Sequence, residues 1–477
     1  MKLAGVSYRI VLGAFVALGT YGAAAYALLL LGQPASEWIV IVATIVAVLV
    51  ATKRQISQPT GDPCPRWLAW SSTLVLLSVT VALVIGVLAT PARHWDGVVA
   101  WELKAFWLSV EPTIEQPFFR DAGVFSHSRD YPLLQPLLMA AGNRLLGPGS
   151  GRLLLPLLYL LLVATVGTAL RHSQRGGVLP WLVALAVGTT PTLITPSNGG
   201  ADSGYAELFL TTCVAASAAG LLLKDRTLMF LGIFTAVLVK PEGLVYGAVA
   251  IPVLWCRSET QLLRTATAGW LLGAALWLPL QNDLYHLGNS SAHVIVWTAL
   301  GAIGTLIVGS DVLLRTRVGA RARIWITAAA FPALLLALPL VVAGTSGSGT
   351  SIGTYLQGFD QLLERVEQTG HVVSGFARYA FLRMGFALTF WVPLLAAMAF
   401  ALKKVRLPEP SLWIFTALGL LSVLGPFLLS PEADMEHHIR SSMSRLQLHW
   451  VGAAWILAGV WVAELRGLPP TGRSRVG

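Results

Sequence analysis

The sequence predicts an all-α polytopic membrane protein, and its composition supplies the main reasons. Of the 477 residues, 55% are hydrophobic and 12% are charged, about half of the roughly 25% charge of an ordinary soluble domain. The mean hydropathy is +0.69. A soluble chain of this size would expose too little charge to resist aggregation. Disorder needs a more polar chain, and three cysteines are too few for a disulfide scaffold.

Apolar runs recur along the chain and predict about 12 to 14 transmembrane helices. The first run, near residues 8–31, is too long for a signal-peptide core, so we expect a retained membrane helix. The runs near 227–239 and 243–256 are short, which predicts a hairpin whose tip lies below the membrane surface. The other runs lie near 37–51, 68–90, 152–170, 178–195, 204–223, 266–282, 292–312, 324–343, 376–402, 411–429 and 449–463.

The basic residues predict how the chain is oriented in a cytoplasmic (inner) membrane. With both termini in the cytoplasm, 21 of the 33 lysines and arginines fall in cytoplasmic loops, as the positive-inside rule requires. The net charge of +10 therefore indicates membrane topology, and no nucleic acid partner is expected. We divide the chain into N-terminal membrane helices (1–67), a membrane domain with outer loops 91–151, 344–375 and 430–450 (68–465), and a cytoplasmic tail (466–477).

The first outer loop carries the most informative group of polar residues. Its segments are His94-Trp95-Asp96-Gly97, Trp101-Glu102-Leu103-Lys104 and Ser128-Arg129-Asp130-Tyr131-Pro132. If the part after Asp96 is helical, Asp96, Ala100 and Lys104 line one face. A carboxylate beside aromatic rings at the membrane boundary could have a raised pKa and act as a general base. The alternative is an amphipathic helix anchored on the membrane by its tryptophans, Trp95, Trp101 and Trp107.

Two further segments place charges at membrane depth, where ionisable residues are usually functional. Lys240 and Glu242 flank Pro241 at the tip of the short hairpin. The lysine could bind a phosphate and the glutamate could hold the lysine in place; alternatively, the tip reaches the outer water and the two side chains pair locally. Glu207 is expected about one turn inside a helix, where a carboxylate without a partner is costly.

The last outer loop contains two arginines and two adjacent histidines near the final spans. Arg440 and Arg445 are good phosphate ligands if they face a cavity, and contact with lipid headgroups is the alternative. His437 and His438 diverge on a helix and lack the i, i+4 spacing of helical zinc ligands. No metal site is therefore assigned, and a divalent metal cofactor stays open.

Together these segments resemble bacterial membrane glycosyltransferases of the GT-C superfamily, in particular the RgtA/B/C/D-like group related to the protein O-mannosyltransferases. The order of the motifs and their placement on the outer side carry the resemblance, over roughly residues 68–460. Glutamate at 207 and proline at 241 depart from the family's aspartate and asparagine. Two extra spans also precede the aspartate loop. The matching segments are Trp95-Asp96-Gly97, Asp130-Tyr131-Pro132, Gly204-Tyr205-Ala206-Glu207-Leu208, Lys240-Pro241-Glu242-Gly243 and Ser444-Arg445-Leu446.

The resemblance implies a GT-C-type fold with amphipathic helices on the outer face. It also implies transfer of a hexose or pentose, with inversion, from a polyprenyl-phosphate sugar to an acceptor hydroxyl. The acceptor would be a glycan, lipid or protein of the cell envelope, reached from the outer side of the membrane. Asp96 would be the general base. The donor phosphate would be bound by Lys240, Arg440, Arg445 and Arg129. The residues that orient these cations or contact the sugar or acceptor would be Glu102, Lys104, Asp130, Tyr131, Glu207 and Glu242.

Two alternatives remain open from the sequence. A transporter or flippase of a lipid-linked sugar would explain the many spans and buried charges, although a transport path should carry polar residues at several depths. An O-antigen ligase or polymerase would use a diphosphate-linked donor and depend on arginine and histidine in a late outer loop. Residues 344–375 and 430–450 fit that description, whereas the early aspartate loop opposes it.

Overall fold

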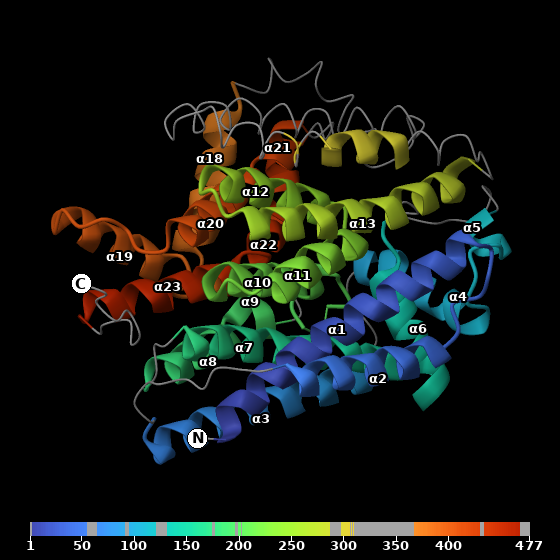
Figure 1. The fold of residues 1–477 in the computed structure, drawn as a ribbon, viewed down its shortest axis with the longest axis horizontal. Coiled ribbons are helices and arrows are strands. Elements are labelled where there is room, and N and C mark those ends of the chain that lie inside the picture. Colours follow the sequence, from blue (N-terminus) through green and yellow to red (C-terminus); the bar gives the residue numbers. More distant parts are fainter. Residues whose placement is uncertain are drawn as a thin grey trace.

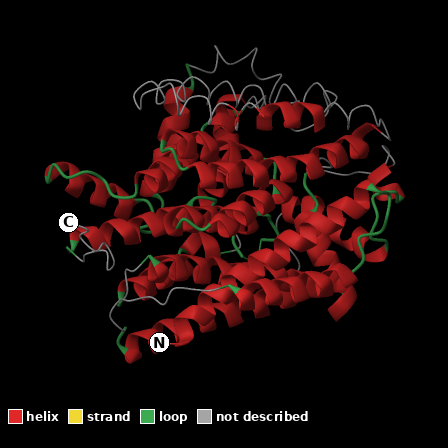
Figure 2. Ribbon diagram, in the orientation of Figure 1, coloured by secondary structure: helices red, strands yellow, loops and turns green. Residues whose placement is uncertain are grey.

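The described part of the protein consists of helices and loops (Figure 2). The computed structural model describes residues 2–54, 64–90, 95–120, 131–173, 177–195, 199–201, 203–286, 297–305, 307, 309, 367–429 and 434–467. No strand occurs in these ranges, which confirms the all-α prediction for them. The prediction of a GT-C-type arrangement is not tested by this finding.

Several helices are long and apolar enough to cross a membrane, so the protein is membrane-embedded. Four qualify within the described residues, and a pair bent by 51° could form a fifth. Six further apolar helices in the described part of the chain are shorter, and the expected total of 12 to 14 spans stays a prediction. The four long segments are Ser7–Leu30, Arg66–Ala89, Ser150–His172 and Pro410–Leu428, and the bent pair is Met435–Leu448 with Val451–Leu465.

The N-terminal helices pack directly onto the rest of the bundle. Helix α1 (Lys2–Leu30) contacts α2 (Trp38–Lys53), α7 (Leu154–His172), α11 (Arg226–Val239) and α13 (Thr260–His286). Helix α3 (Arg66–Ala89) contacts α7 and α8 (Leu179–Gly188). In Figure 1, α1 starts and α23 (Val451–Leu465) ends toward the left, whereas α4 and α5 lie at the right. Large apolar side chains such as Ile45 and Leu77 are exposed on α2 and α3, as expected of a lipid-facing surface.

Helix α10 (Glu207–Leu223) lies at the centre of the bundle. It contacts α7, α11, α20 (Pro410–Ser422), α22 (Met435–Leu448) and α23, and nearly all of its side chains are buried. Small residues allow this close packing. A Cβ on Gly232 of α11 would lie 2.5 Å from Ser217 Oγ, and one on Gly452 of α23 would lie 2.6 Å from Ala215 Cβ.

The segment between α3 and α7 folds into short helices that cover one end of the bundle. They are the π-helix η1 (Gly97–Glu102), α4 (Leu103–Val110), α5 (Pro117–Arg120), α6 (Leu134–Leu146) and the 3-10 helix η2 (Ser150–Leu153). Helix α6 packs against η1, α4 and η2. The Tyr131-Pro132 segment therefore leads into a helix that supports the aspartate-bearing loop.

The short hairpin is confirmed, because α11 has 14 residues and α12 (Glu242–Cys256) has 15. Other runs do not form single helices. Residues 376–402 were expected to be one span, but they include the end of α18 (Thr369–Ala377), η4 (Arg378–Leu382), η5 (Met384–Phe386) and α19 (Trp391–Leu402). This run breaks where Arg383 is extended and Ala387 has a φ of +46°, both incompatible with a continuous helix.

Two other runs divide in a similar way. Residues 178–195 form α8 and α9 (Pro191–Ile194), since Pro191 cannot continue the hydrogen bonding of α8. Residues 411–429 contain a short break between α20 and α21 (Gly425–Leu429), but Pro410–Leu428 still qualifies as one candidate span, as predicted. The run 324–343, most of loop 344–375 and the tail from 468 lie outside the described residues.

Candidate functional site

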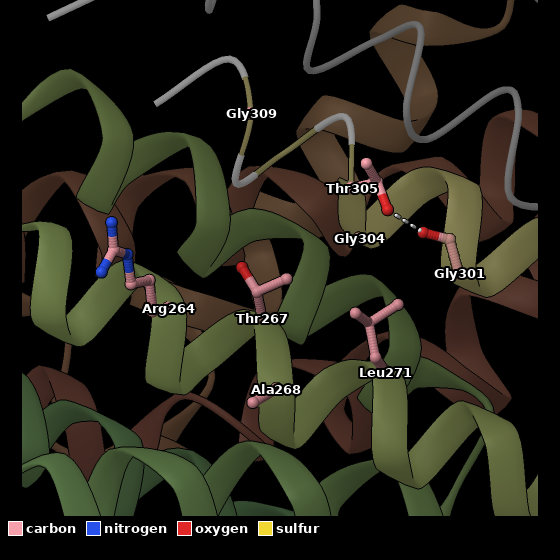
Figure 3. A pocket seen from close by; sticks show the side chains of 8 residues that line it. All are labelled: Arg264, Thr267, Ala268, Leu271, Gly301, Gly304, Thr305 and Gly309. Atoms are coloured by element: carbon pink, nitrogen blue, oxygen red, sulfur yellow. Dashed lines mark hydrogen bonds between the residues drawn. The ribbon is translucent and has the colours of Figure 1, made fainter. Parts of the chain in front are cut away.

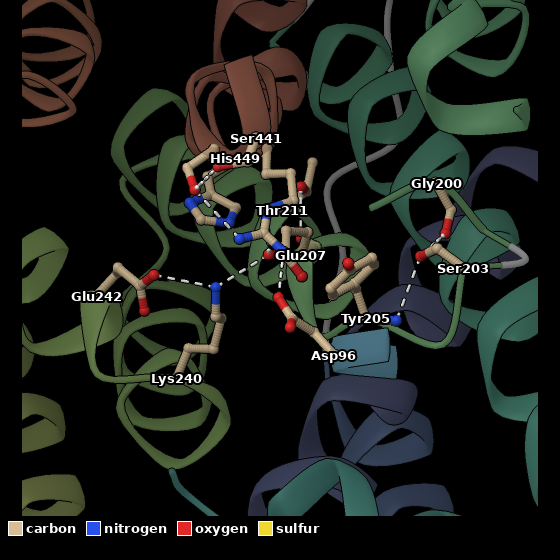
Figure 4. Close-up of polar contacts among 12 residues, drawn as sticks. Asp96, Gly200, Ser203, Tyr205, Glu207, Thr211, Lys240, Glu242, Ser441 and His449 are labelled. Carbon is tan, nitrogen blue, oxygen red and sulfur yellow. Dashed lines mark hydrogen bonds and ion pairs between the residues drawn. The ribbon is translucent and has the colours of Figure 1, made fainter. Parts of the chain in front are cut away.

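Five charged side chains from four distant segments meet next to the amino terminus of α10 (Figure 4). Arg445 Nη1 lies 2.7 Å from Asp96 Oδ2, and Arg445 Nε lies 3.9 Å from Glu207 Oε1. Lys240 Nζ lies 3.1 Å from the same Glu207 oxygen and 3.0 Å from Glu242 Oε1. We call Asp96, Arg445, Glu207, Lys240 and Glu242 the charge chain. Its signs alternate, and it contains three carboxylates and two cations.

The tip of the hairpin positions Lys240 and Glu242 through the backbone preferences of Lys240-Pro241-Glu242-Gly243. Lys240 is extended, with φ −152° and ψ 153°, as a residue before proline prefers. Glu242 is the first residue of α12, where a carboxylate interacts favourably with the helix dipole. Gly243 is required by close packing, because a Cβ there would lie 2.0 Å from the carbonyl oxygen of Ala236.

Glu207 is the first residue of α10, and not one turn inside the helix as expected. The helix starts late because Gly204 has a φ of +79° and the preceding residues form a turn. In this turn the Ser203 hydroxyl donates to Gly200 O (2.7 Å) and accepts from the backbone N–H of Tyr205 (3.2 Å). The Glu207 side chain is only 2% exposed. Its Oε1 contacts both cations, whereas its Oε2 is buried without a hydrogen-bond partner.

Asp96 immediately precedes η1, and the backbone of Gly97 rests on the Ser203 turn. A Cβ on Gly97 would lie 2.3 Å from Ser203 O, so only glycine allows this approach. The segment is helical as expected, but the assumed i, i+4 face is wrong. Residues 97–102 form a π-helix with an i→i+5 bond from Leu103 N–H to Val98 O, and this winding differs from the α-helical spacing. Asp96 therefore faces Arg445 and keeps 34% of its side chain exposed.

Arg445 is fixed on several sides besides Asp96. Its guanidinium carbon lies 4.8 Å from the centre of the Tyr205 ring, and its Nη2 donates to Ser442 Oγ at 3.3 Å. The first contact is a cation–π interaction. Burial raises the pKa of the Tyr205 hydroxyl above its ordinary value, so the ring beneath Arg445 stays neutral.

Tyr246 and His449 extend the site and were not predicted from the sequence. The Tyr246 hydroxyl and His449 Nδ1 share a hydrogen bond of 2.7 Å, and His449 Nε2 is buried without a partner. Tyr246 follows Glu242 by four residues and His449 follows Arg445 by four, so each lies one helical turn from a charge-chain member. This spacing is the sequence signal that could have identified both. The Trp450 ring packs edge-on to Tyr246 and holds the pair in place.

Several predicted site residues lie outside the charge chain. Glu102 pairs with Arg152 at 2.6 Å, and Arg152 also donates to Thr90 O at 3.1 Å, which ties η1 to the end of α3. Lys104 is buried, with its Nζ 5.9 Å from the centre of the Tyr131 ring. Arg440 is exposed on α22 and is not part of the charge chain. Arg129 and Asp130 lie outside the described residues.

The membrane-anchor interpretation is wrong for Trp101 and stays a prediction for Trp95 and Trp107. Trp95 is 65% exposed and Trp107 is 37% exposed, whereas Trp101 is buried at 1%. The Trp101 ring packs against Tyr131, with a centroid separation of 5.6 Å. Trp101 is therefore a core residue that joins η1 to the start of α6.

No group of three or more His, Cys, Asp or Glu side chains is placed to hold a metal ion in the part of the chain described. A groove of about 570 Å³ lies between α13 and the helical residues 297–305 (Figure 3). Its lining is apolar apart from Arg264, Thr267 and Thr305. None of its lining residues belongs to the charge chain, so the charge chain is the better candidate for chemistry.

No protein-family model matches the chain, and no curated protein or solved structure shows significant similarity to it. The fold and the site together define a membrane-embedded all-helical protein with a largely buried chain of alternating charges. Any activity must therefore be argued from the chemistry of that site.

Proposed function

We propose that the protein is an integral membrane glycosyltransferase that moves a hexose or pentose from a polyprenyl-phosphate donor to a hydroxyl of a cell-envelope acceptor. The reaction takes place on the outer side of the cytoplasmic membrane. The observation that carries the proposal is the contact of Asp96, a partly exposed carboxylate, with Arg445 at 2.7 Å. A potential base and a potential phosphate ligand are therefore neighbours. The order of the motifs along the sequence supports the same class.

The chemistry assigns separate roles to these two residues. Asp96 takes the proton of the acceptor hydroxyl, whose oxygen forms a bond to the anomeric carbon of the sugar. The bond from that carbon to the donor phosphate breaks, and polyprenyl phosphate leaves with the electron pair. A single displacement of this kind inverts the anomeric centre. Arg445 stabilises the negative charge that develops on the leaving phosphate.

Lys240 supports the stabilisation of the phosphate charge indirectly, through Glu207, which contacts Arg445. Its side chain is 6% exposed and is held between Glu207 and Glu242, so direct contact with a phosphate would require these ion pairs to open. A charged group in this position would be costly to retain without a role. We therefore assign Lys240 to orienting Glu207, which in turn faces Arg445.

The proposal is tested with the purified protein in nanodiscs and a panel of polyprenyl-monophosphate sugars, with an envelope extract as acceptor. We expect wild type to consume one donor and Asp96→Asn to lower the transfer rate by roughly 10²- to 10⁴-fold. Glu115→Gln is the matched control, since Glu115 is a 53% exposed carboxylate paired with Arg120 on the same outer segment. This variant should transfer sugar at the wild-type rate.

Two results would contradict the proposal in different ways. Near-normal transfer by Asp96→Asn would remove Asp96 as the base while leaving the enzyme class intact. Consumption of a diphosphate-linked donor, with no monophosphate donor consumed, would favour a ligase or polymerase.

A further inference from the structure

We infer that Asp96 occupies, in the resting protein, the place that the donor phosphate takes on Arg445, so that donor binding itself releases the base. This inference rests on the proposed function and concerns the regulation of the same site. The exchange needs an arginine that stays fixed, a carboxylate that can move, and a similar ionic geometry in the two anions.

The position of Arg445 does not depend on Asp96 alone. The Tyr205 ring lies 4.8 Å from its guanidinium carbon, Ser442 Oγ accepts from its Nη2 at 3.3 Å, and Glu207 lies 3.9 Å from its Nε. These three groups contact parts of the guanidinium other than Nη1. Nη1 faces Asp96, so replacing this carboxylate by another anion leaves the other contacts intact.

Asp96 is the member of the charge chain that is best placed to move. Its side chain is 34% exposed, compared with 2% for Glu207 and 21% for Glu242. Glu207 contacts two cations and Glu242 contacts Lys240 at the opposite end of the chain. Displacing Asp96 therefore opens the most exposed ion pair of the charge chain.

A carboxylate and the phosphate of the donor present the same pattern to an arginine. The donor phosphate is a diester, with one negative charge and two free oxygens, as in an aspartate carboxylate. Arginine binds both anions through similar N–H···O geometry. The charge chain already has three carboxylates against two cations. A donor that bound without displacing Asp96 would thus have to share Nη1 of Arg445 with that carboxylate.

The exchange couples donor binding to the activation of the base. While Asp96 is paired with Arg445, its Oδ2 is held by Nη1 of the guanidinium at 2.7 Å and is occupied by this ion pair. Once the phosphate has replaced Asp96 on Nη1, Oδ2 is released and can accept the proton of the acceptor hydroxyl. The sugar on that phosphate then lies beside the released carboxylate. The protein thereby holds its base inactive until the donor has bound.

The test is the affinity of the protein in nanodiscs for polyprenyl monophosphate, the reaction product, measured by isothermal titration calorimetry. Asp96→Asn removes the competing carboxylate, so we expect it to bind the product about two- to fivefold more tightly than wild type. Asp96→Ser removes the same charge and serves if the first variant folds poorly. Glu115→Gln should bind with wild-type affinity. Parallel titrations with inorganic phosphate and with phosphatidic acid separate recognition of phosphate from recognition of the polyprenyl chain.

The outcomes separate this inference from the function on which it rests. Unchanged or weaker binding by folded Asp96→Asn and Asp96→Ser overturns the exchange, even if wild type transfers sugar. Absence of both product binding and sugar transfer in wild type overturns the exchange and the proposed function together. Tighter binding of phosphatidic acid alone by the variants supports the exchange but contradicts a polyprenyl donor.

Discussion

The two ends of α11 carry buried charges with different surroundings. Asp225 precedes the helix and Lys240 follows it. Because Arg226–Val239 has 14 residues, the helix that separates these two residues is about 21 Å long at 1.5 Å per residue. Both ends contain ion pairs within the same packed bundle. They differ in how many of their buried polar atoms have hydrogen-bond partners.

At the first end, both oxygens of Asp225 are fully used. Oδ1 accepts from the backbone N–H groups of Thr227 (2.8 Å) and Leu228 (3.1 Å), and Oδ2 accepts from Arg54 (3.0 Å) and from the Tyr8 hydroxyl. This is an N-cap combined with an ion pair. Such an arrangement stabilises the helix and ties it to α1 and to the end of α2.

At the other end, the charge chain leaves several buried polar atoms without hydrogen bonds. They include Glu207 Oε2, Glu242 Oε2 and Arg445 Nε, together with His449 Nε2 nearby. Each such atom costs about 1–3 kcal/mol. Polar atoms without hydrogen bonds can bind the polar groups of a ligand, so the charge chain is suited to bind one. Both oxygens of Asp225 already have hydrogen-bond partners. The comparison therefore separates a stabilising cluster from a candidate binding site.

The largest effect is expected from Lys240→Met, which would leave Glu207 and Glu242 without their shared cation. Removing one partner of a buried ion pair costs about 3–5 kcal/mol. The measurement is thermal unfolding of the purified protein in detergent, and a large fall in Tm is expected.

The double variant Lys240→Met/Glu207→Gln is the control for this prediction. It removes one of the two carboxylates that have lost Lys240, so part of the lost stability should return, which a double-mutant cycle measures as coupling. If the loss of unfolding free energy in the double variant equals the sum of the losses in the two single variants, Lys240 and Glu207 do not interact. The charge chain would then lack the contact between these two residues.

A smaller effect on stability, but a clear one on activity, is expected from Gly97→Ala. The new Cβ would lie 2.3 Å from Ser203 O, so the backbone must shift, at a cost of about 1–3 kcal/mol. The shift moves Asp96 away from Arg445, and a displacement of 1 Å can lower a rate by roughly 100-fold. The checks are sugar transfer per folded protein and Tm.

Gly86→Ala is the matched control, because no atom lies within 4 Å of a Cβ at that position in α3. Alanine should be tolerated there and could add about 0.5–1 kcal/mol of stability. Equal transfer rates for the two variants would show that the contact of Gly97 with the Ser203 turn does not position the base.

The sequence predicted the parts of this architecture that depend on local pattern. Apolar run lengths predicted the membrane character and the short hairpin at Lys240. Because charged residues are rare at membrane depth, Glu207, Lys240 and Glu242 were identified as candidate site residues. The order of the motifs added Asp96 and Arg445. All five lie together in the structure.

The contacts themselves depend on tertiary packing and could not be predicted. Nothing local indicates that Arg445 would pair with Asp96, which is 349 positions away in the sequence. The winding of η1 also escaped prediction, because the pattern around Trp101 fits an α-helix as well as a π-helix. The same holds for Glu207, whose place at the start of α10 depends on the Ser203 turn.

The smallest effect is expected from Asp225→Asn, at the stabilising end of α11. The amide oxygen can still accept from the N–H groups of Thr227 and Leu228, so the cap is largely kept. The amide nitrogen takes the place of Oδ2 and can donate to the Tyr8 hydroxyl. The ion pair with Arg54 is lost, and because Arg54 is 42% exposed the cost should be about 1 kcal/mol. Sugar transfer per folded protein should equal that of wild type, since the charge chain is untouched. A loss of transfer well beyond the loss of folded protein would mean that the two ends of α11 are coupled, and that Asp225 is more than a helix cap.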